Sequence, residues 1–487
     1  MGEIVGSGVL LLLAAWCSVR RFRYLLTPST VFVGVWFVIF VLYALDPFLL
    51  HLFSVPVTGF AAALHLASLL MVLAGAGLAT LFRSHRPLAA ARPDRRRSIA
   101  QFSFVFRAAT ASIIVVLACV VAYKVGMVLH RYGDPFAALC QVRYDLVHGS
   151  FHYPLPASLT TLLTNLALLN LGVWLARRQD MVSIAMVVAL LVLAFLNDLA
   201  TADQEGLRLV VLLACAVYYA ATIYWGSRLS PVQYATWATA LAGVFCLFLL
   251  VGVLRAVPVA RFFGKPVVAL RSGSGCVVGV LAAPPSTTNQ IDSRLVTNGP
   301  QPRRWLEDRV FNATFRHVDG DIVGNYVSSS WFIAKPLPSP VPGANTLSGF
   351  YTLFHRFVGR DGSAMSASPD PRFYANIVGV GVFNTTDYIA IFYSDFGLAG
   401  ALILSAFMGA GAQWVFLRAR DNARLADTQA LALVTMGLFM SVRGNYFGAV
   451  GFWFTLLLVY AQERAFGRLG EVSAAGAHLV EDGKPRV

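Results

Sequence analysis

The sequence predicts an all-helical protein that crosses a membrane many times. Of its 487 residues, 57% are hydrophobic and only 13% are charged, and the mean hydropathy is +0.67. Soluble proteins carry about a quarter charged residues. Apolar runs of about 20 residues, the length that spans a bilayer, also recur along the chain.

These apolar runs predict eleven spans, at 4–19, 28–45, 59–82, 108–129, 157–176, 181–196, 208–225, 231–254, 396–417, 428–442 and 446–462. The first run lacks a basic leading region and a small-residue cleavage site, so we expect a retained span rather than a cleaved signal. Cysteines inside the runs (Cys17, Cys119, Cys215 and Cys246) are expected to be small buried side chains.

Basic clusters orient the spans, because Lys and Arg concentrate on the cytoplasmic side. Each cluster follows an odd-numbered span: Arg20, Arg21 and Arg23; Arg83, Arg86, Arg92, Arg95, Arg96 and Arg97; Arg177 and Arg178; Arg228; Arg418, Arg420 and Arg424; and Arg464, Arg468, Lys484 and Arg486. The amino terminus is therefore predicted outside the cytoplasm and the carboxyl terminus inside. The net charge of +14 does not indicate nucleic-acid binding, since 20 of the 38 basic residues lie in predicted cytoplasmic segments, where they meet anionic lipid.

Four parts follow from this topology. A membrane portion of about eight spans covers 1–254 and includes an external loop at 130–156; a large external insert covers 255–384; a second membrane portion covers 385–462; and a cytoplasmic tail covers 463–487. We expect the insert to form a structured lid, with short amphipathic helices around 303–317 and 345–357.

The insert breaks the usual charge bias, because it carries 13 Lys and Arg against 7 Asp and Glu on the external side. Such a departure indicates a site for an anionic ligand, and the diphosphate of a lipid-linked sugar is the best candidate.

Candidate phosphate ligands are arginines, whose guanidinium fork grips phosphate oxygens in a bidentate way. Arg131 and Arg143 lie in the loop 130–156, where the alternative is a solvated loop that meets lipid headgroups. Arg309 lies in the insert near other basic residues, where the alternative is an amphipathic helix with scattered charge. Arg208 and Arg443 each lie at the outer end of a predicted span, where basic residues are disfavoured.

Candidate acid–base groups are fewer. His355 and His317 in the insert could act as a general base near neutral pH, or they could be ordinary surface side chains. Asp387 and Asp395 flank an apolar stretch at the outer boundary, and an aspartate at that depth needs a partner, for which Arg208 and Arg443 are candidates. No metal-ligand spacing, P-loop, GxSxG or dinucleotide-binding fingerprint is present, so we expect no metal and no cofactor.

The chain resembles the bacterial O-antigen polymerases, which join oligosaccharide repeat units at the inner membrane. Arg309 and Gly320 resemble the R-x10-G pattern of these enzymes, and the most specific likeness is Asn384-Thr385-Thr386 followed by Tyr393-x-Asp395-Phe396-Gly397-x-x-Gly400. The architecture of many spans with a middle and a late external loop extends the resemblance along nearly the whole chain. The earlier loop departs from the pattern, since Pro154 stands eleven positions after Arg143.

The resemblance implies a metal-independent glycosyltransferase with a GT-C-like fold and a periplasmic active face. Its substrates would be undecaprenyl-diphosphate-linked glycans, and a chain-length regulator protein would be a further partner alongside membrane lipid. The diphosphate would lie against Arg143, Arg309, Arg443, Arg208 and Arg131, with His355, His317 or Asp395 acting on the acceptor hydroxyl.

Two other functions fit part of the pattern. An O-antigen ligase, which transfers glycan to lipid A–core, would share the arginine-bearing loop, but the run from Asn384 to Gly400 favours the polymerase. A transporter of lipid-linked sugars would show internal symmetry, discontinuous helices and ionisable groups at mid-membrane. Lys124 is almost the only charge well inside a predicted span, which disfavours the transporter.

Overall fold

A computed structural model of the chain describes residues 2–49, 57–83, 103–133, 142, 157–177, 181–201, 206–226, 323–330, 332–334, 343, 345–347, 350 and 387–465. The regular structure of these residues is entirely helical. Seven of the described helices are long and apolar enough to cross a membrane, and two shorter apolar helices accompany them. The predicted all-helical, multi-pass class is therefore confirmed at this level.

The helices of the first half are α1 (Gly2–Phe22), α2 (Pro28–Leu49), α3 (Gly59–Arg83), α5 (Ser103–Tyr132), α7 (Ala157–Leu175), α8 (Met181–Thr201) and α9 (Gly206–Tyr219). A π-helical turn, Ala220–Tyr224, continues α9. The second half contains α14 (Tyr388–Asn422), α15 (Leu425–Met440), two 3-10 turns (Ser441–Arg443 and Tyr446–Gly448) and a last helix at 450–465.

A helix lies at each predicted span except 231–254, which falls outside the described residues. The predicted helix at 303–317 also falls outside them, and of the one predicted at 345–357 only the turn residues 345–347 and residue 350 are described. One predicted span begins too late. We expected it at 396–417, but α14 starts at Tyr388 and is broken at Gly397, where the backbone is not helical.

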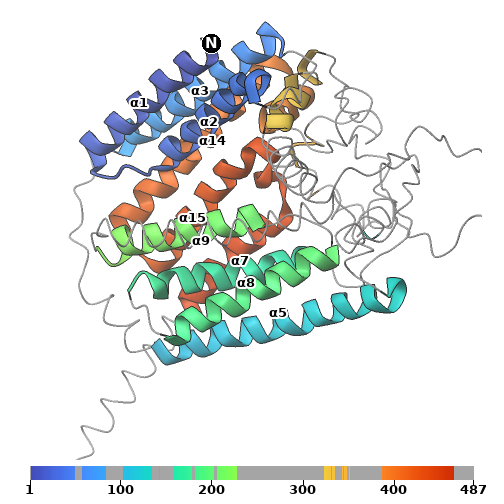
Figure 1. Ribbon diagram of the computed structural model, residues 1–487. Helices are drawn as coiled ribbons and strands as arrows, with labels where there is room; N and C mark the ends of the chain where they lie inside the picture. The colour runs from blue at the N-terminus through green and yellow to red at the C-terminus, as the bar shows by residue number, and fades with distance from the viewer. Residues whose placement is uncertain are drawn as a thin grey trace, which may run out of the picture.

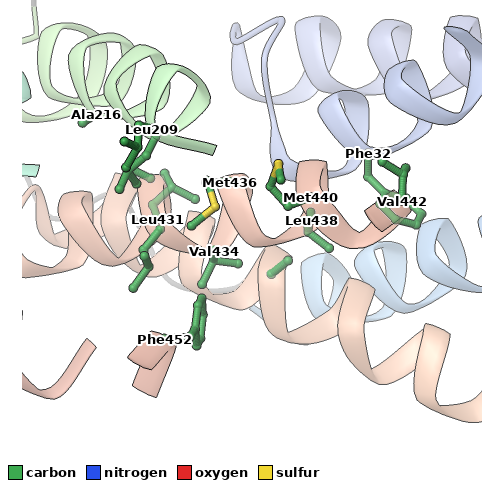
Figure 2. Close-up of a cluster of buried hydrophobic side chains, with 14 of the residues drawn as sticks. Phe32, Leu209, Ala216, Leu431, Val434, Met436, Leu438, Met440, Val442 and Phe452 are labelled. Atoms are coloured by element: carbon green, nitrogen blue, oxygen red, sulfur yellow. The ribbon is translucent and has the colours of Figure 1, made fainter. Parts of the chain in front are cut away.

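The helices form two groups joined by α15 (Figure 1). In one group, α1, α2 and α3 pack with α14; in the other, α5, α7, α8 and α9 pack together, and α15 contacts both α9 and α2. Figure 2 shows apolar side chains of α15, among them Leu431, Val434 and Met436, between Leu209 of α9 and Phe452 of the last helix. Nearly all of α15 is buried, so it forms the centre of the fold.

The crossing of α3 and α14 depends on glycine. A Cβ atom on Gly75 would lie 1.9 Å from the carbonyl oxygen of Ala406, and one on Gly409 would lie 2.0 Å from that of Val72. Small residues let helix backbones approach closely in membranes, and these two positions allow only glycine.

The segments that we predicted to share the cytoplasmic side contact one another. Arg83 of α3 pairs with Asp421 of α14 (3.2 Å), and Arg418 of α14 pairs with Asp427 of α15 (2.7 Å). Beyond α7, the guanidinium of Arg177 lies 4.6 Å from the centre of the Trp225 ring. The first two contacts join the ends of α3, α14 and α15, and the third joins the ends of α7 and α9; the side of the membrane on which these ends lie stays a prediction.

The prediction that cysteines in the apolar runs are buried is wrong for two of them. Cys17 and Cys119 are exposed and Cys215 is half-buried, whereas Cys246 lies outside the described residues. In a membrane-spanning helix both the protein-facing and the lipid-facing sides are apolar, so an apolar run alone does not establish burial inside the protein.

Candidate functional site

The predicted site residues divide into two sets. Arg143, Arg309, His317 and His355 lie outside the described residues. Arg131, Arg208, Asp395 and Arg443 are described, and their surroundings differ.

Asp395 holds a turn of the insert. One carboxylate oxygen accepts hydrogen bonds from the backbone N–H (3.4 Å) and the side-chain amide (3.0 Å) of Asn345, and the other accepts one from the backbone N–H of Thr346 (2.6 Å). The expected pairing of this aspartate with Arg208 or Arg443 is therefore wrong within the described part of the chain. Backbone and amide donors take the place of an arginine.

The same turn is held from its other side by the connection that carries Arg443. The side-chain amide of Asn445 donates to the carbonyl oxygen of Thr346 at 2.7 Å. A Cβ atom on Gly448 would lie 2.3 Å from that oxygen, so only glycine fits there. We call the contact of Asp395, Asn345, Thr346 and Asn445 the Asp395 junction. It joins α14, the insert and the half-buried Arg443 connection.

The break in α14 lies directly after this junction. Gly397 has φ +67°, a left-handed value that favours glycine. Gly397 belongs to the run from Tyr393 to Gly400, so the first glycine of this run is the residue that breaks the helix. The break lets the first turns of α14, which carry Asp387 and Asp395, depart from the direction of the long apolar part.

The contacts described for Arg208 and Arg131 do not involve the Asp395 junction. The buried guanidinium of Arg208 donates to the side-chain oxygen of Asn165 on α7, and the Asn165 amide donates to Thr455 of the last helix at 3.4 Å. Arg131 is exposed at the end of α5, with its guanidinium 5.6 Å from the centre of the Tyr132 ring. The structure thus brings Asp395 close to the Arg443 connection and gives Arg208 different partners.

Lys124 is a buried cation inside α5, as its position in the sequence indicated. Its ammonium group donates to the hydroxyl of Thr160 on α7 (2.7 Å) and to the side-chain oxygen of Asn197 on α8 (3.1 Å). The first turns of α7 therefore supply polar partners to two buried cations, Lys124 and Arg208.

The sequence did not indicate a buried histidine–aspartate pair that the structure contains. Nε2 of His65 on α3 lies 2.7 Å from the Oδ2 atom of Asp387, and both side chains are fully buried. The other ring nitrogen of His65 lies 2.7 Å from the carbonyl oxygen of Ala61, which can only accept a hydrogen bond. One proton therefore lies between His65 and Asp387, and the pair is neutral overall whichever of the two carries it.

Asp387 also begins α14. Its Oδ1 atom accepts a hydrogen bond from the backbone N–H of Ala390 at 2.9 Å, the usual bond of an N-cap residue. His65 and Asp387 are 322 positions apart, and His65 stands alone in an apolar run. The N-cap preference for aspartate is the only local signal that could have drawn attention to the pair.

A short helix of the insert, residues 323–330, packs beside this pair. Its residues are buried, and the hydroxyls of Ser329 and Ser330 accept hydrogen bonds from the backbone N–H groups of Asp387 and Thr58, both at 2.9 Å. Burial, with Glu3, Tyr43 and Asp387 nearby, raises the pKa of the Tyr326 phenol well above its usual value. Tyr326 is therefore a neutral hydroxyl group at physiological pH.

Comparison with known proteins gave no match: no family model fits the sequence, and no curated protein or solved structure is similar to the chain. In addition, no three His, Cys, Asp or Glu side chains of the described residues lie close enough together to hold a metal ion.

Proposed function

We propose that this chain is a membrane glycosyltransferase that polymerises oligosaccharide repeat units carried on undecaprenyl diphosphate. The protein would have about eleven spans in a GT-C-like arrangement. It would lie in a bacterial inner membrane with its amino terminus in the periplasm and its carboxyl terminus in the cytoplasm. The transfer would take place at the periplasmic face and contribute to O-antigen or a related surface polysaccharide.

The Asp395 junction is the observation that carries the proposal. The run that most resembles the polymerases, from Asn384 to Gly400, supplies Asp395 to the junction and Gly397 to the break in α14. The same junction holds the insert beside the connection of Arg443, the described arginine that lies nearest to it in the chain. A sequence run that only packed helices together would not have to bind the insert.

The proposed reaction joins two lipid-linked glycans. A hydroxyl of the non-reducing sugar of the incoming unit attacks the anomeric carbon of the growing chain, whose bond to the diphosphate breaks. The diphosphate gains negative charge in the transition state, which fixed guanidinium groups of Arg143, Arg309 and Arg443 would stabilise without a metal. His355 or His317 would accept the proton of the attacking hydroxyl.

Asp395 takes a different role in this proposal. Both of its oxygens already accept hydrogen bonds from the insert, so we assign it to the positioning of residues 345–346 rather than to proton transfer.

Deleting the gene and analysing the surface polysaccharide tests the proposal. The expected result is lipid A–core that carries a single repeat unit, because one unit can still be ligated when polymerisation is lost. Unsubstituted core with stored lipid-linked polymer would instead indicate a ligase, and intermediates trapped at the cytoplasmic face would indicate a transporter.

The arginines give a second prediction. Replacing Arg143, Arg309 or Arg443 separately with Ala should reduce long-chain glycan by about 100-fold or more, since a lost transition-state donor costs about 3–4 kcal/mol. The measurement is glycan length on gels together with protein level on immunoblots. Arg20→Ala, an exposed arginine of α1, is the control, and wild-type chain lengths in all three variants would contradict the role.

A transporter of lipid-linked sugars is a second candidate, favoured by two observations. The described helices contain more buried ionisable groups than the sequence indicated, namely Lys124, Asp198, Arg208, Asp427 and the His65–Asp387 pair, and α14 is broken at Gly397. Buried charges and discontinuous helices are typical of transporters. The deletion experiment above separates the two candidates.

A further inference from the structure

A phenol ring of the insert fills a cage of aromatic side chains in the membrane portion. The ring of Tyr326 has its centre 5.2 Å from that of Phe40, 5.4 Å from Tyr43, 6.2 Å from Trp36 and 4.9 Å from His65. All four rings are steeply inclined to it, by 69° to 89°. We call Trp36, Phe40, Tyr43 and His65 the aromatic cage. Tyr326 is only 1% exposed inside it.

The cage and its surroundings also contain polar groups that packing does not satisfy. Trp36 Nε1 and the hydroxyl of Tyr326 are buried and have no hydrogen-bond partner among the described residues, whereas the hydroxyl of Tyr388 lies beside those of Ser405 and Ser68. The rings of Trp36 and Tyr388 are neighbours, with centres 6.4 Å apart. Buried polar groups in proteins are nearly always hydrogen-bonded. Phenylalanine at position 326 would fill the same space without leaving a hydroxyl unsatisfied, so packing alone does not account for Tyr326.

The charge at the cage favours a neutral ligand. Asp387 gives one oxygen to the N–H of Ala390 and the other to His65, and the pair has no net charge. The remaining nearby carboxylate, Glu3, is partly exposed and is not a member of the cage. Among the described residues no uncompensated carboxylate lines the cage to strengthen the binding of an organic cation by its aromatic faces.

Two hydrogen bonds that hold the insert helix can be replaced by water when the helix leaves the cage. Ser329 and Ser330 bind backbone N–H groups at the starts of α14 and α3, and water can take over such bonds at helix ends. Withdrawal of 323–330 would open the cage and give its unsatisfied donor, Trp36 Nε1, access to a ligand.

We propose that the aromatic cage is a binding site for one sugar ring, which Tyr326 occupies as an internal substitute. The ring faces would cover the apolar face of a pyranose, while Trp36 Nε1 would donate a hydrogen bond to one of its hydroxyl groups. The assignment of the ligand to a glycan rests on the proposed function; the cage and its occupant do not.

The test is sugar binding by the full-length protein in nanodiscs, with Tyr326→Ala as the main variant. The probes are methyl glycosides of hexoses, deoxyhexoses and N-acetylhexosamines, followed by saturation-transfer NMR. At least one glycoside should bind Tyr326→Ala about tenfold or more tightly than it binds the wild type, because the wild type must first empty the cage. Adding Trp36→Ala to this variant should abolish the gain.

Tyr123→Ala, which removes a tyrosine that α5 exposes, is the matched control and should bind like the wild type. Replacing Ser329 and Ser330 together with Ala leaves the cage intact but weakens the docking of the insert helix, so it should also tighten binding. This double variant decides the question if Tyr326→Ala does not fold.

Failure of every glycoside to bind the folded variants overturns the proposal, as does preferential binding of tetramethylammonium. The outcome is independent of the gene deletion. Long-chain glycan in the deletion strain would refute the polymerase and leave the sugar site standing, and absent binding would refute the site alone.

Discussion

Two aspartates near the start of α14 have different structural roles. Asp387 is buried, caps the helix and shares a proton with His65, whereas Asp395 is half-buried and binds a turn of the insert. The sequence indicated that both needed partners, because carboxylates at a membrane boundary are costly alone. It could not indicate the partners, since Asn345 lies 50 positions from Asp395 in a turn-rich stretch and His65 lies 322 positions from Asp387.

Asp395→Ala should release the turn at 345–347. The loss of hydrogen bonds to Asn345 and Thr346 should lower stability by about 1–3 kcal/mol, since two backbone donors lose their partner. Faster cleavage of the insert in limited proteolysis would report the release. Ser394→Ala removes a long 3.4 Å contact to Asn345 and a bond to the carbonyl oxygen of Ile391 within α14, so it should have little effect on the turn. Equal protease resistance of the two variants would show that the junction does not hold the insert.

At the scale of elements, α3 and α14 are the pair whose packing is most sensitive to side-chain size. Their approach is so close that a methyl group on Gly75 or Gly409 would overlap a backbone carbonyl, an atom that no side-chain rotation can move away. Glycines are frequent in this sequence, and their number does not reveal which of them make contacts. Gly77 and Gly411, two positions after the critical glycines, face open space.

This difference gives a paired prediction. Gly75→Ala and Gly409→Ala should each lower the melting temperature in detergent, with a cost of about 1–3 kcal/mol for overpacking. Gly77→Ala and Gly411→Ala should leave it unchanged or raise it slightly, because alanine has the higher helix propensity. A similar response of all four variants would mean that the two helices do not cross as described.

At the scale of the whole molecule, the positions of the helices were predictable and their neighbours were not. Long apolar runs mark spans because the bilayer thickness fixes their length. The same runs do not distinguish α15, which is almost entirely buried, from α1, which exposes Leu12 and Trp16. Both environments are apolar, so contact with lipid and contact with protein favour the same residues. The aromatic cage could not be predicted from the sequence either, because its members and Tyr326 come from three separate parts of the chain, α2, α3 and the insert.

The orientation in the membrane can be tested by labelling. Ser339→Cys, in the predicted periplasmic insert, should react in intact spheroplasts with a maleimide that cannot cross the membrane. Ser98→Cys, in the predicted cytoplasmic loop, should react only after lysis. Both substitutions should be made in a variant in which Ser replaces Cys140 and Cys276, since these two cysteines lie in predicted external loops and could react with the maleimide themselves. Protection at position 339 together with labelling at position 98 in intact spheroplasts would show that the topology is the inverse of the predicted one.

The π-helical turn that continues α9 has a consequence for the polar end of that helix. Its wider bond, from the N–H of Trp225 to the carbonyl of Ala220 at 2.8 Å, accommodates one surplus residue compared with a regular turn. Deleting a single residue between 220 and 224 would restore the ordinary pitch without turning the rest of α9, because the wider turn already absorbs the rotation of about 100° that one extra residue adds to an α-helix. A deletion in the regular part of α9, where no wide turn compensates for it, would instead rotate Arg208 by about 100° and break its bond to Asn165.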